Sequence, residues 1–196
     1  MSYRNYYKLY FESIFMTGKV LLPPHYEALE GPLIFLGGPI KGAPYWHNEA
    51  VQIIQRNANE IHIASPSRRV DEKYLDANPT PFKHSANQEE WEQVDWETFY
   101  LNRASKDGCI LFWLPLEANH YCERAYAQTS RVEIGEWKTK HLETGCKLVI
   151  GFQPNFSGEQ YLRYRLAKEC PNIPICSTLE ETCITAIEKS RTKSVC

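Results

Sequence analysis

The longest apolar run of the chain is Cys109-Ile110-Leu111-Phe112-Trp113-Leu114-Pro115-Leu116. It is far shorter than the roughly 18 residues that a membrane-spanning helix needs, and its length suits a buried strand. Because every position is apolar, rather than every second one, we expect residues 109–114 to lie in the middle of a sheet that is covered on both faces. This pattern is typical of a parallel sheet.

Segments typical of strands and of helices alternate on both sides of this run. Further strands are expected at residues 33–36, 61–64, 147–151 and 173–175. The spacing of apolar residues predicts helices at residues 46–57, 87–105, 130–143, 157–169 and 178–189. This alternation predicts an α/β fold, and five strands suggest a flavodoxin-like three-layer sandwich with a five-stranded parallel sheet.

The composition is that of a globular protein with one core, since 43% of its 196 residues are hydrophobic and 23% are charged. We interpret residues 1–15 as an N-terminal extension, residues 16–190 as a single domain and residues 191–196 as a C-terminal tail. The formal net charge of -2 leaves no basic excess for nucleic-acid binding. The 7 cysteines contain no Cys-x-x-Cys pair. Together with the lack of an apolar signal segment, this indicates a cytoplasmic protein with reduced thiols and no membrane partner, metal or cofactor.

In a parallel sheet of this kind, the ligand binds beyond the carboxyl ends of the strands. The loops at residues 37–45, 65–86, 115–129 and 152–156 are therefore expected to carry the function. The first of them, Gly37-Gly38-Pro39-Ile40-Lys41-Gly42, offers free backbone amides before a helix, which suits a sugar or a phosphate. The alternative is a turn that only needs glycine. Trp46 follows this loop and is the best candidate for stacking on a ligand.

Arginine and glutamate side chains fall in or next to the other loops. Arg68 and Arg69 follow the second expected strand, and each offers a planar fork for phosphate or carboxylate; the alternative is two solvated charges. Glu133 lies near a helix start, where Ser130-x-x-Glu133 equally fits a capping box without any chemistry. Ser177-x-x-Glu180 fits the same motif for the last helix. Glu97 lies on the 87–105 helix, where most glutamates are simply exposed to solvent. If it lies beside a second carboxyl, however, the two could act as nucleophile and as acid or base at a C1′ carbon.

Five segments in a fixed order resemble the nucleoside 2-deoxyribosyltransferase family, which also contains nucleoside 5′-monophosphate N-glycosidases. They are Ile34-Phe35-Leu36-Gly37-Gly38-Pro39-Ile40 with Trp46, Ser65-Pro66-Ser67-Arg68-Arg69, Gln93-Val94-Asp95-Trp96-Glu97, residues 109–115, and Arg131-Val132-Glu133-Ile134-Gly135. The resemblance covers about residues 33–165. It implies that Glu133 attacks C1′ and that Glu97 holds the sugar or assists protonation of the base. An alternative register, allowed by Lys106-Asp107, places Phe99 at the position of Glu97.

The resemblance also implies how the substrate is held. Gly37, Gly38, Pro39 and Ile40 would bind the base or sugar through their backbone, with Trp46 close by. Family members commonly form dimers or hexamers in which a neighbouring chain completes the site, and Gln153 or Asn155 could be the donated group. Family transferases often have an aspartate shortly before the nucleophile, whereas residues 125–131 contain no acid, so base recognition should differ here.

The expected function is therefore cleavage of the N-glycosidic bond of a nucleoside or 2′-deoxynucleoside through a glycosyl-Glu133 intermediate. The sugar is then transferred to another base or to water, without a cofactor and in a homo-oligomer. One alternative is a nucleoside 5′-monophosphate N-glycosidase in which Arg68 or Arg69 binds the phosphate. Another is a non-catalytic protein that binds or senses nucleotides.

Overall fold

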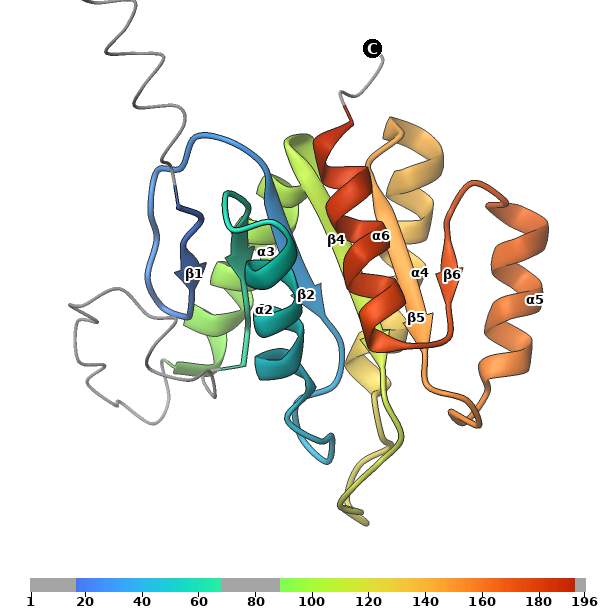
Figure 1. Cartoon of the computed structure of the whole chain (residues 1–196). Coiled ribbons are helices and arrows are strands. Elements are labelled where there is room, and N and C mark those ends of the chain that lie inside the picture. Colours follow the sequence, from blue (N-terminus) through green and yellow to red (C-terminus); the bar gives the residue numbers. More distant parts are fainter. Residues whose placement is uncertain (1–16, 68–88, 193–196) are drawn as a thin grey trace, which may run out of the picture.

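The computed structural model describes residues 17–67 and 89–192. Its centre is one parallel sheet with the strand order β1-β3-β2-β4-β5-β6 (Figure 1). The strands are β1 Val20–Leu21, β2 Leu33–Gly37, β3 His62–Ala64, β4 Gly108–Leu114, β5 Leu148–Phe152 and β6 Ile175–Cys176. The helices are α2 Trp46–Asn57, α3 Glu89–Lys106, α4 Gln128–Thr144, α5 Glu159–Glu169 and α6 Leu179–Arg191.

The α/β class and the parallel sheet are confirmed, but the sheet has six strands where five were expected. The additional strand is β1, which pairs in parallel with β3 through Val20↔Ile63 and Leu21↔Ala64. Two residues are too few to show the alternating pattern by which a strand is recognised in a sequence. Without β1, the order of the other five strands is that of a flavodoxin-like sheet.

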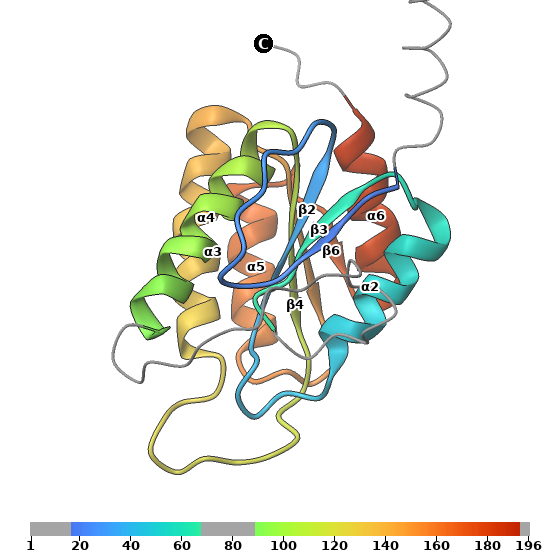
Figure 2. The same ribbon diagram turned by 90° about the vertical axis from the view of Figure 1, so that its left-hand side faces the viewer.

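The apolar run that contains β4 lies in the middle of the sheet, as expected. All seven residues of β4 are buried, and the strand pairs with β2 on one side and β5 on the other. Ile110 and Phe112 pack into the core under α3, α4 and α5, whereas Leu111 and Trp113 pack into the core under α2 and α6. Figure 2 shows these two helical layers on opposite faces of the sheet.

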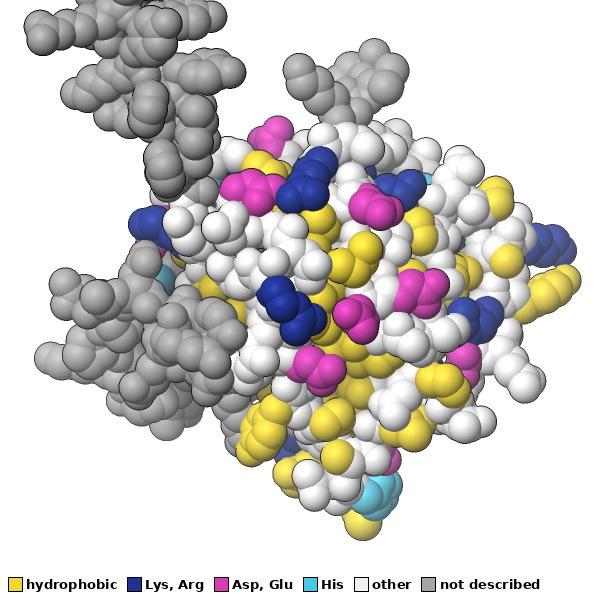
Figure 3. Space-filling model, viewed as in Figure 1, with side chains coloured by type: hydrophobic (Ala, Val, Ile, Leu, Met, Phe, Trp, Pro, Cys, Tyr) yellow, Lys and Arg dark blue, Asp and Glu magenta, His cyan; other side chains and the backbone are white. Residues whose placement is uncertain are grey.

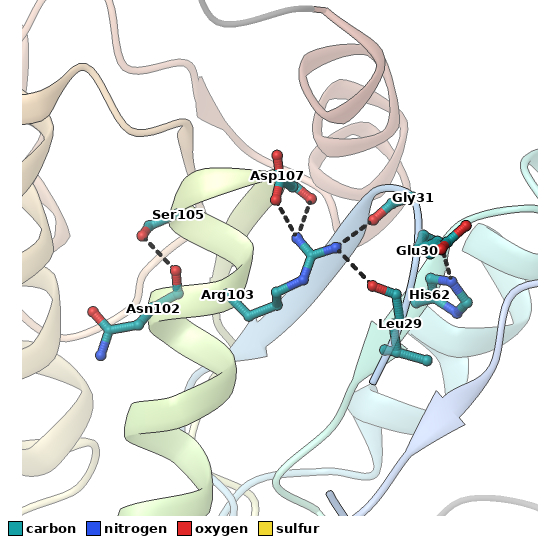
Figure 4. Close-up of polar contacts among 8 residues, drawn as sticks. All are labelled: Leu29, Glu30, Gly31, His62, Asn102, Arg103, Ser105 and Asp107. Atoms are coloured by element: carbon teal, nitrogen blue, oxygen red, sulfur yellow. Dashed lines mark hydrogen bonds and ion pairs between the residues drawn. The ribbon is translucent and has the colours of Figure 1, made fainter. Parts of the chain in front are cut away.

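A hydrogen-bonded clamp fixes the amino ends of the strands. The Arg103 guanidinium on α3 donates to the carbonyl oxygens of Leu29, at 3.3 Å, and Gly31, at 2.8 Å, and it pairs with Asp107 at 3.0 Å (Figure 4). Beside this clamp, buried His62 accepts a hydrogen bond from the Lys19 amide through Nδ1. These contacts hold the segment before β2 at the sheet edge opposite to the one expected to bind ligand.

The surface carries charges of both signs. On the face formed by α2 and α6, Lys or Arg side chains alternate with Asp or Glu side chains, as in the pairs Arg56–Glu180 and Arg191–Glu60 (Figure 3). The six cysteines within the described residues are free, and all except Cys122 are buried. No helix in the described ranges has both the length and the apolar character needed to cross a membrane.

Candidate active site

A cleft of about 390 Å³ opens beyond the carboxyl ends of β2 and β3. Its lining includes residues 37–41 of the 37–42 loop, called here the glycine loop. Pro66 after β3, one face of α3 and the start of α4 complete the walls. Figure 1 shows that the loops following β2, β4 and β5 all lie at this edge of the sheet. The structure therefore places a cleft where the parallel-sheet rule predicts a ligand.

The glycine loop packs so closely on β4 that only glycine fits at its start. A Cβ atom on Gly37 would lie 2.5 Å from the Phe112 ring, and one on Gly38 would lie 2.2 Å from the carbonyl oxygen of Trp113. Gly38 also has a φ of 145°, a conformation that other residues rarely adopt. The two glycines are thus needed for packing, and the same backbone forms the wall of the cleft together with Pro39 and Ile40.

Trp46 supports the glycine loop from behind. It begins α2, is only 2% exposed, and its indole Nε1 donates to the carbonyl oxygen of Pro39 over 2.9 Å. The next residue, His47, is buried against the Trp46 ring, and burial lowers its pKa to about 3. Its Nε2 has no hydrogen-bond partner within the described residues. Trp46 is not part of the cleft lining, and its indole contributes a hydrogen bond to the loop. The stacking role expected for it stays a prediction.

Glu133 lines the cleft, but it is not part of a capping box. Helix α4 begins at Gln128, after Ala127 in a left-handed conformation, and no side chain caps it. Glu133 is therefore in the second turn, too far along the helix to reach the orphan amides of the first. The expected box at the last helix is also displaced by one residue, because Thr178 Oγ1 accepts from the Glu181 amide and α6 begins at Leu179.

Glu97, and not Phe99, faces Glu133 across the cleft. The lining includes Glu97 from α3 and Glu133 from α4, and both side chains are half-buried. Phe99 lies on another side of α3, where it is 47% exposed and contacts the Tyr26 ring edge-on at 5.2 Å between centroids. Of the two residues, Glu97 alone lines the cleft; the correspondence of either one to the family's acidic residue stays a prediction.

The two carboxyls have different electrostatic environments. Burial, together with the charges of Glu97 and Glu136, raises the pKa of Glu133 to about 7. Burial also raises the pKa of Glu97, but a hydrogen bond from Gln93 opposes this effect. The Gln93 amide nitrogen donates to Glu97 Oε1 over 2.9 Å and to the carbonyl oxygen of Pro66 over 3.4 Å. The donor of Gln93 thus favours the ionised form of Glu97.

Two basic residues that were not singled out from the sequence also line the cleft. Lys41 comes from the glycine loop and Arg124 from the loop of residues 115–127. Lys41 pairs with Glu123 at 3.2 Å and lies over the Tyr121 ring at 4.5 Å, so it connects these two loops at the mouth of the cleft. The position of both residues after strands of a parallel sheet was the signal that could have indicated them. Arg68 and Arg69 lie outside the described residues.

Gln153 and Asn155 order the turn after β5 and do not line the cleft. Gln153 Oε1 accepts a hydrogen bond from the Leu116 amide over 2.9 Å. Asn155 adopts a φ of 72°, and its backbone N–H donates to Glu159 Oε2 over 2.9 Å. The donation of either side chain to the site of a neighbouring chain stays a prediction.

Within residues 17–67 and 89–192, no group of three or more His, Cys, Asp or Glu side chains could hold a metal ion.

Scans of protein-family models, curated proteins and solved structures find no match to the chain. The fold and the site together define an α/β protein with a parallel sheet and a cleft that carries two carboxyls. Any assignment of function therefore rests on the residues that this cleft brings together.

Proposed function

We propose that the protein cleaves the N-glycosidic bond of a nucleoside or 2′-deoxynucleoside. The observation that carries this proposal is that half-buried Glu97 and Glu133, from two different helices, line one cleft beside the glycine loop. Two carboxyls with separated roles are the usual arrangement for cleavage at an anomeric carbon. A volume of about 390 Å³ lies within the range of small-molecule sites.

The roles proposed here are those that the resemblance implies for Glu133 and Glu97. An oxygen of Glu133 forms a bond with C1′ while the C1′–N bond breaks, and the departing base takes the electron pair together with a proton. Glu97 delivers that proton. In the second half of the reaction, a nitrogen of another base or a water molecule attacks C1′ and releases Glu133. Transfer and hydrolysis differ only in this second acceptor.

A second candidate substrate is a nucleoside 5′-monophosphate, and the basic groups of the cleft favour it. Lys41 and Arg124 both line the cleft. No side chain caps the first turn of α4, and Thr129 and Ser130 in that turn line the cleft at the positive end of the helix dipole. This combination suits a phosphate group. It supports the monophosphate alternative through residues other than Arg68 and Arg69.

We also infer a homo-oligomer, because α4 presents large apolar side chains to solvent. Val132 is 71% exposed and Leu142 is 58% exposed. Light scattering on the purified protein should give a mass at least twice the 22.8 kDa of one chain. A monomer at micromolar concentration would contradict the inference.

The function is tested by chromatography of reaction mixtures. The protein is incubated with 2′-deoxynucleosides, ribonucleosides and their monophosphates, each with and without a second free base. A new nucleoside that appears only with the second base establishes transfer, and base release without an acceptor establishes hydrolysis. Ligand binding without base release would instead favour the non-catalytic alternative and would contradict the proposal.

A further inference from the structure

Gln93 joins the end of β3 to the carboxyl pair through a single amide group. Its Nε2 donates one hydrogen to Glu97 Oε1, at 2.9 Å, and lies 3.4 Å from the carbonyl oxygen of Pro66. Gln93 lies one turn before Glu97 on α3, and it lines the cleft itself. The amide is therefore fixed from two sides, and it holds the carboxylate of Glu97 within the cleft.

The chemistry of the two acceptors settles the orientation of this amide. The carbonyl oxygen of Pro66 only accepts hydrogen bonds, so the nitrogen of the Gln93 amide, and not its oxygen, must face it. The same nitrogen lies 2.9 Å from Glu97 Oε1. The donor must therefore point at Glu97, and a donor at this position favours the ionised carboxylate over the protonated carboxyl.

The other charged groups around Glu97 and Glu133 come from three elements. Glu136 belongs to α4, Lys41 to the glycine loop and Arg124 to the 115–127 loop. Glu136 acts on Glu133, and Lys41 is paired with Glu123. Among the described residues, Gln93 makes the only side-chain hydrogen bond to Glu97.

We propose that Gln93 is a positioning residue that keeps Glu97 ionised in the empty cleft, so that the single proton of the pair resides on Glu133. This inference rests on the proposed function for its consequence in the reaction. The proton passes from Glu133 to Glu97 and then to the nitrogen of the departing base. Glu133 thereby becomes the carboxylate that bonds to C1′, the base accepts the electrons of the C1′–N bond, and no proton is taken from solvent.

The proposal is tested by titrating the two carboxyls directly, without substrate. Carboxyl-carbon NMR of glutamate-labelled protein should show Glu97 titrating at a lower pH than Glu133. In Gln93→Met the side chain has a similar length but no donor, so the Glu97 titration should move up by about one pH unit. Gln93→Glu places a negative charge there and should move it further. Gln55→Met, which removes an amide hydrogen bond to Gly18 outside the cleft, is the matched control and should leave both titrations unchanged.

Unfolding midpoints confirm that each variant is folded before it is titrated. An unchanged Glu97 titration in folded Gln93→Met and Gln93→Glu, or a wild-type Glu133 that titrates before Glu97, would overturn the proposal. The same variants link the inference to activity. In the pH profile of base release, the acidic limb should move to higher pH while the basic limb stays in place. Absence of base release in the wild type would contradict the proposed function alone, since the NMR titrations do not depend on turnover.

Discussion

Glu97 on α3 and Glu133 on α4 line the same cleft, and the charge of the first contributes to raising the pKa of the second to about 7. This relationship exists only in the folded chain, because it depends on α3 and α4 lying on the same face of the sheet. The two carboxyls are therefore unequal, so that one can hold a proton while the other is ionised.

Replacement of Glu133 by Gln should stabilise the protein at neutral pH. The pKa of Glu133 is about 7 in the folded state against an ordinary 4.5. As pH rises from 4.5 to 7, the unfolded chain therefore releases this proton first, and the free energy of unfolding of the wild type falls. Glu133→Gln removes this loss and should be more stable than the wild type above pH 7, by at most about 3 kcal/mol.

The two proteins should be of nearly equal stability near pH 4, where the carboxyl is protonated in both states. Urea unfolding at several pH values measures the difference, with Glu143→Gln at an exposed position of α4 as the control. A constant difference between wild type and Glu133→Gln across the pH range would show that Glu133 is not the group with the raised pKa.

Gly38→Ala should destabilise the protein more than Gly31→Ala does. Both glycines have a positive φ, 145° and 98° respectively, so both substitutions cost backbone strain of about 1 kcal/mol. Only Gly38 lacks space, because its Cβ would lie 2.2 Å from the Trp113 carbonyl oxygen, whereas nothing lies within 4 Å of a Cβ on Gly31. We expect an additional 1–3 kcal/mol for Gly38→Ala, on the order of other overpacked sites. Equal midpoints in denaturant for the two variants would refute the close packing of the glycine loop.

Trp46→Phe should loosen the glycine loop without unfolding the protein. The substitution removes the hydrogen bond from the indole to Pro39 and leaves the buried Pro39 carbonyl oxygen without this donor. The free energy of unfolding should therefore fall by roughly 1–3 kcal/mol. Because the loop forms a wall of the cleft, KM for the substrate should rise while the protein stays folded. Trp137→Phe shortens a buried tryptophan on α4 that makes no indole hydrogen bond within the described residues, and it should leave KM unchanged. An unchanged KM in Trp46→Phe would mean that the loop does not depend on this bond.

Lys41→Met should separate phosphorylated from neutral substrates. A charge-assisted hydrogen bond to phosphate contributes roughly 1–2 kcal/mol, so kcat/KM for a monophosphate should fall about tenfold or more. The value for the corresponding nucleoside should change little. Lys106→Met, which removes the same charge at the far end of α3, is the control. A loss of equal size for both substrates would assign Lys41 to the architecture of the cleft instead of to phosphate recognition.

The strong periodic segments of the fold could be predicted from the sequence, and α2 has the expected bounds of Trp46–Asn57. The edge strand β1 could not, because two residues carry no periodicity. The capping box at Ser130 was a wrong interpretation. The helix begins two residues before Ser130, at Gln128, and its N-cap residue Ala127 has no side chain that could cap it.

The candidate site, too, was predicted only in part. The resemblance predicted that Glu97 and Glu133 act together, and the structure brings both into one cleft. Lys41 and Arg124 fall in loops that were expected to carry the function, but neither they nor Gln93 were singled out, because the convergence of two loops and α3 on one cleft depends on the folded chain. The burial of Trp46 was also beyond sequence reasoning, since an aromatic residue after a loop fits a core and a ligand site equally well.

The most direct test of the central claim is mass spectrometry of the protein quenched in acid during turnover of a 2′-deoxynucleoside. The account predicts a deoxyribosyl group attached to the peptide that contains Glu133, lost on addition of a free base and absent in Glu133→Gln. Attachment at Glu97, or base release by Glu133→Gln at the wild-type rate, would contradict the assignment of Glu133 as the nucleophile.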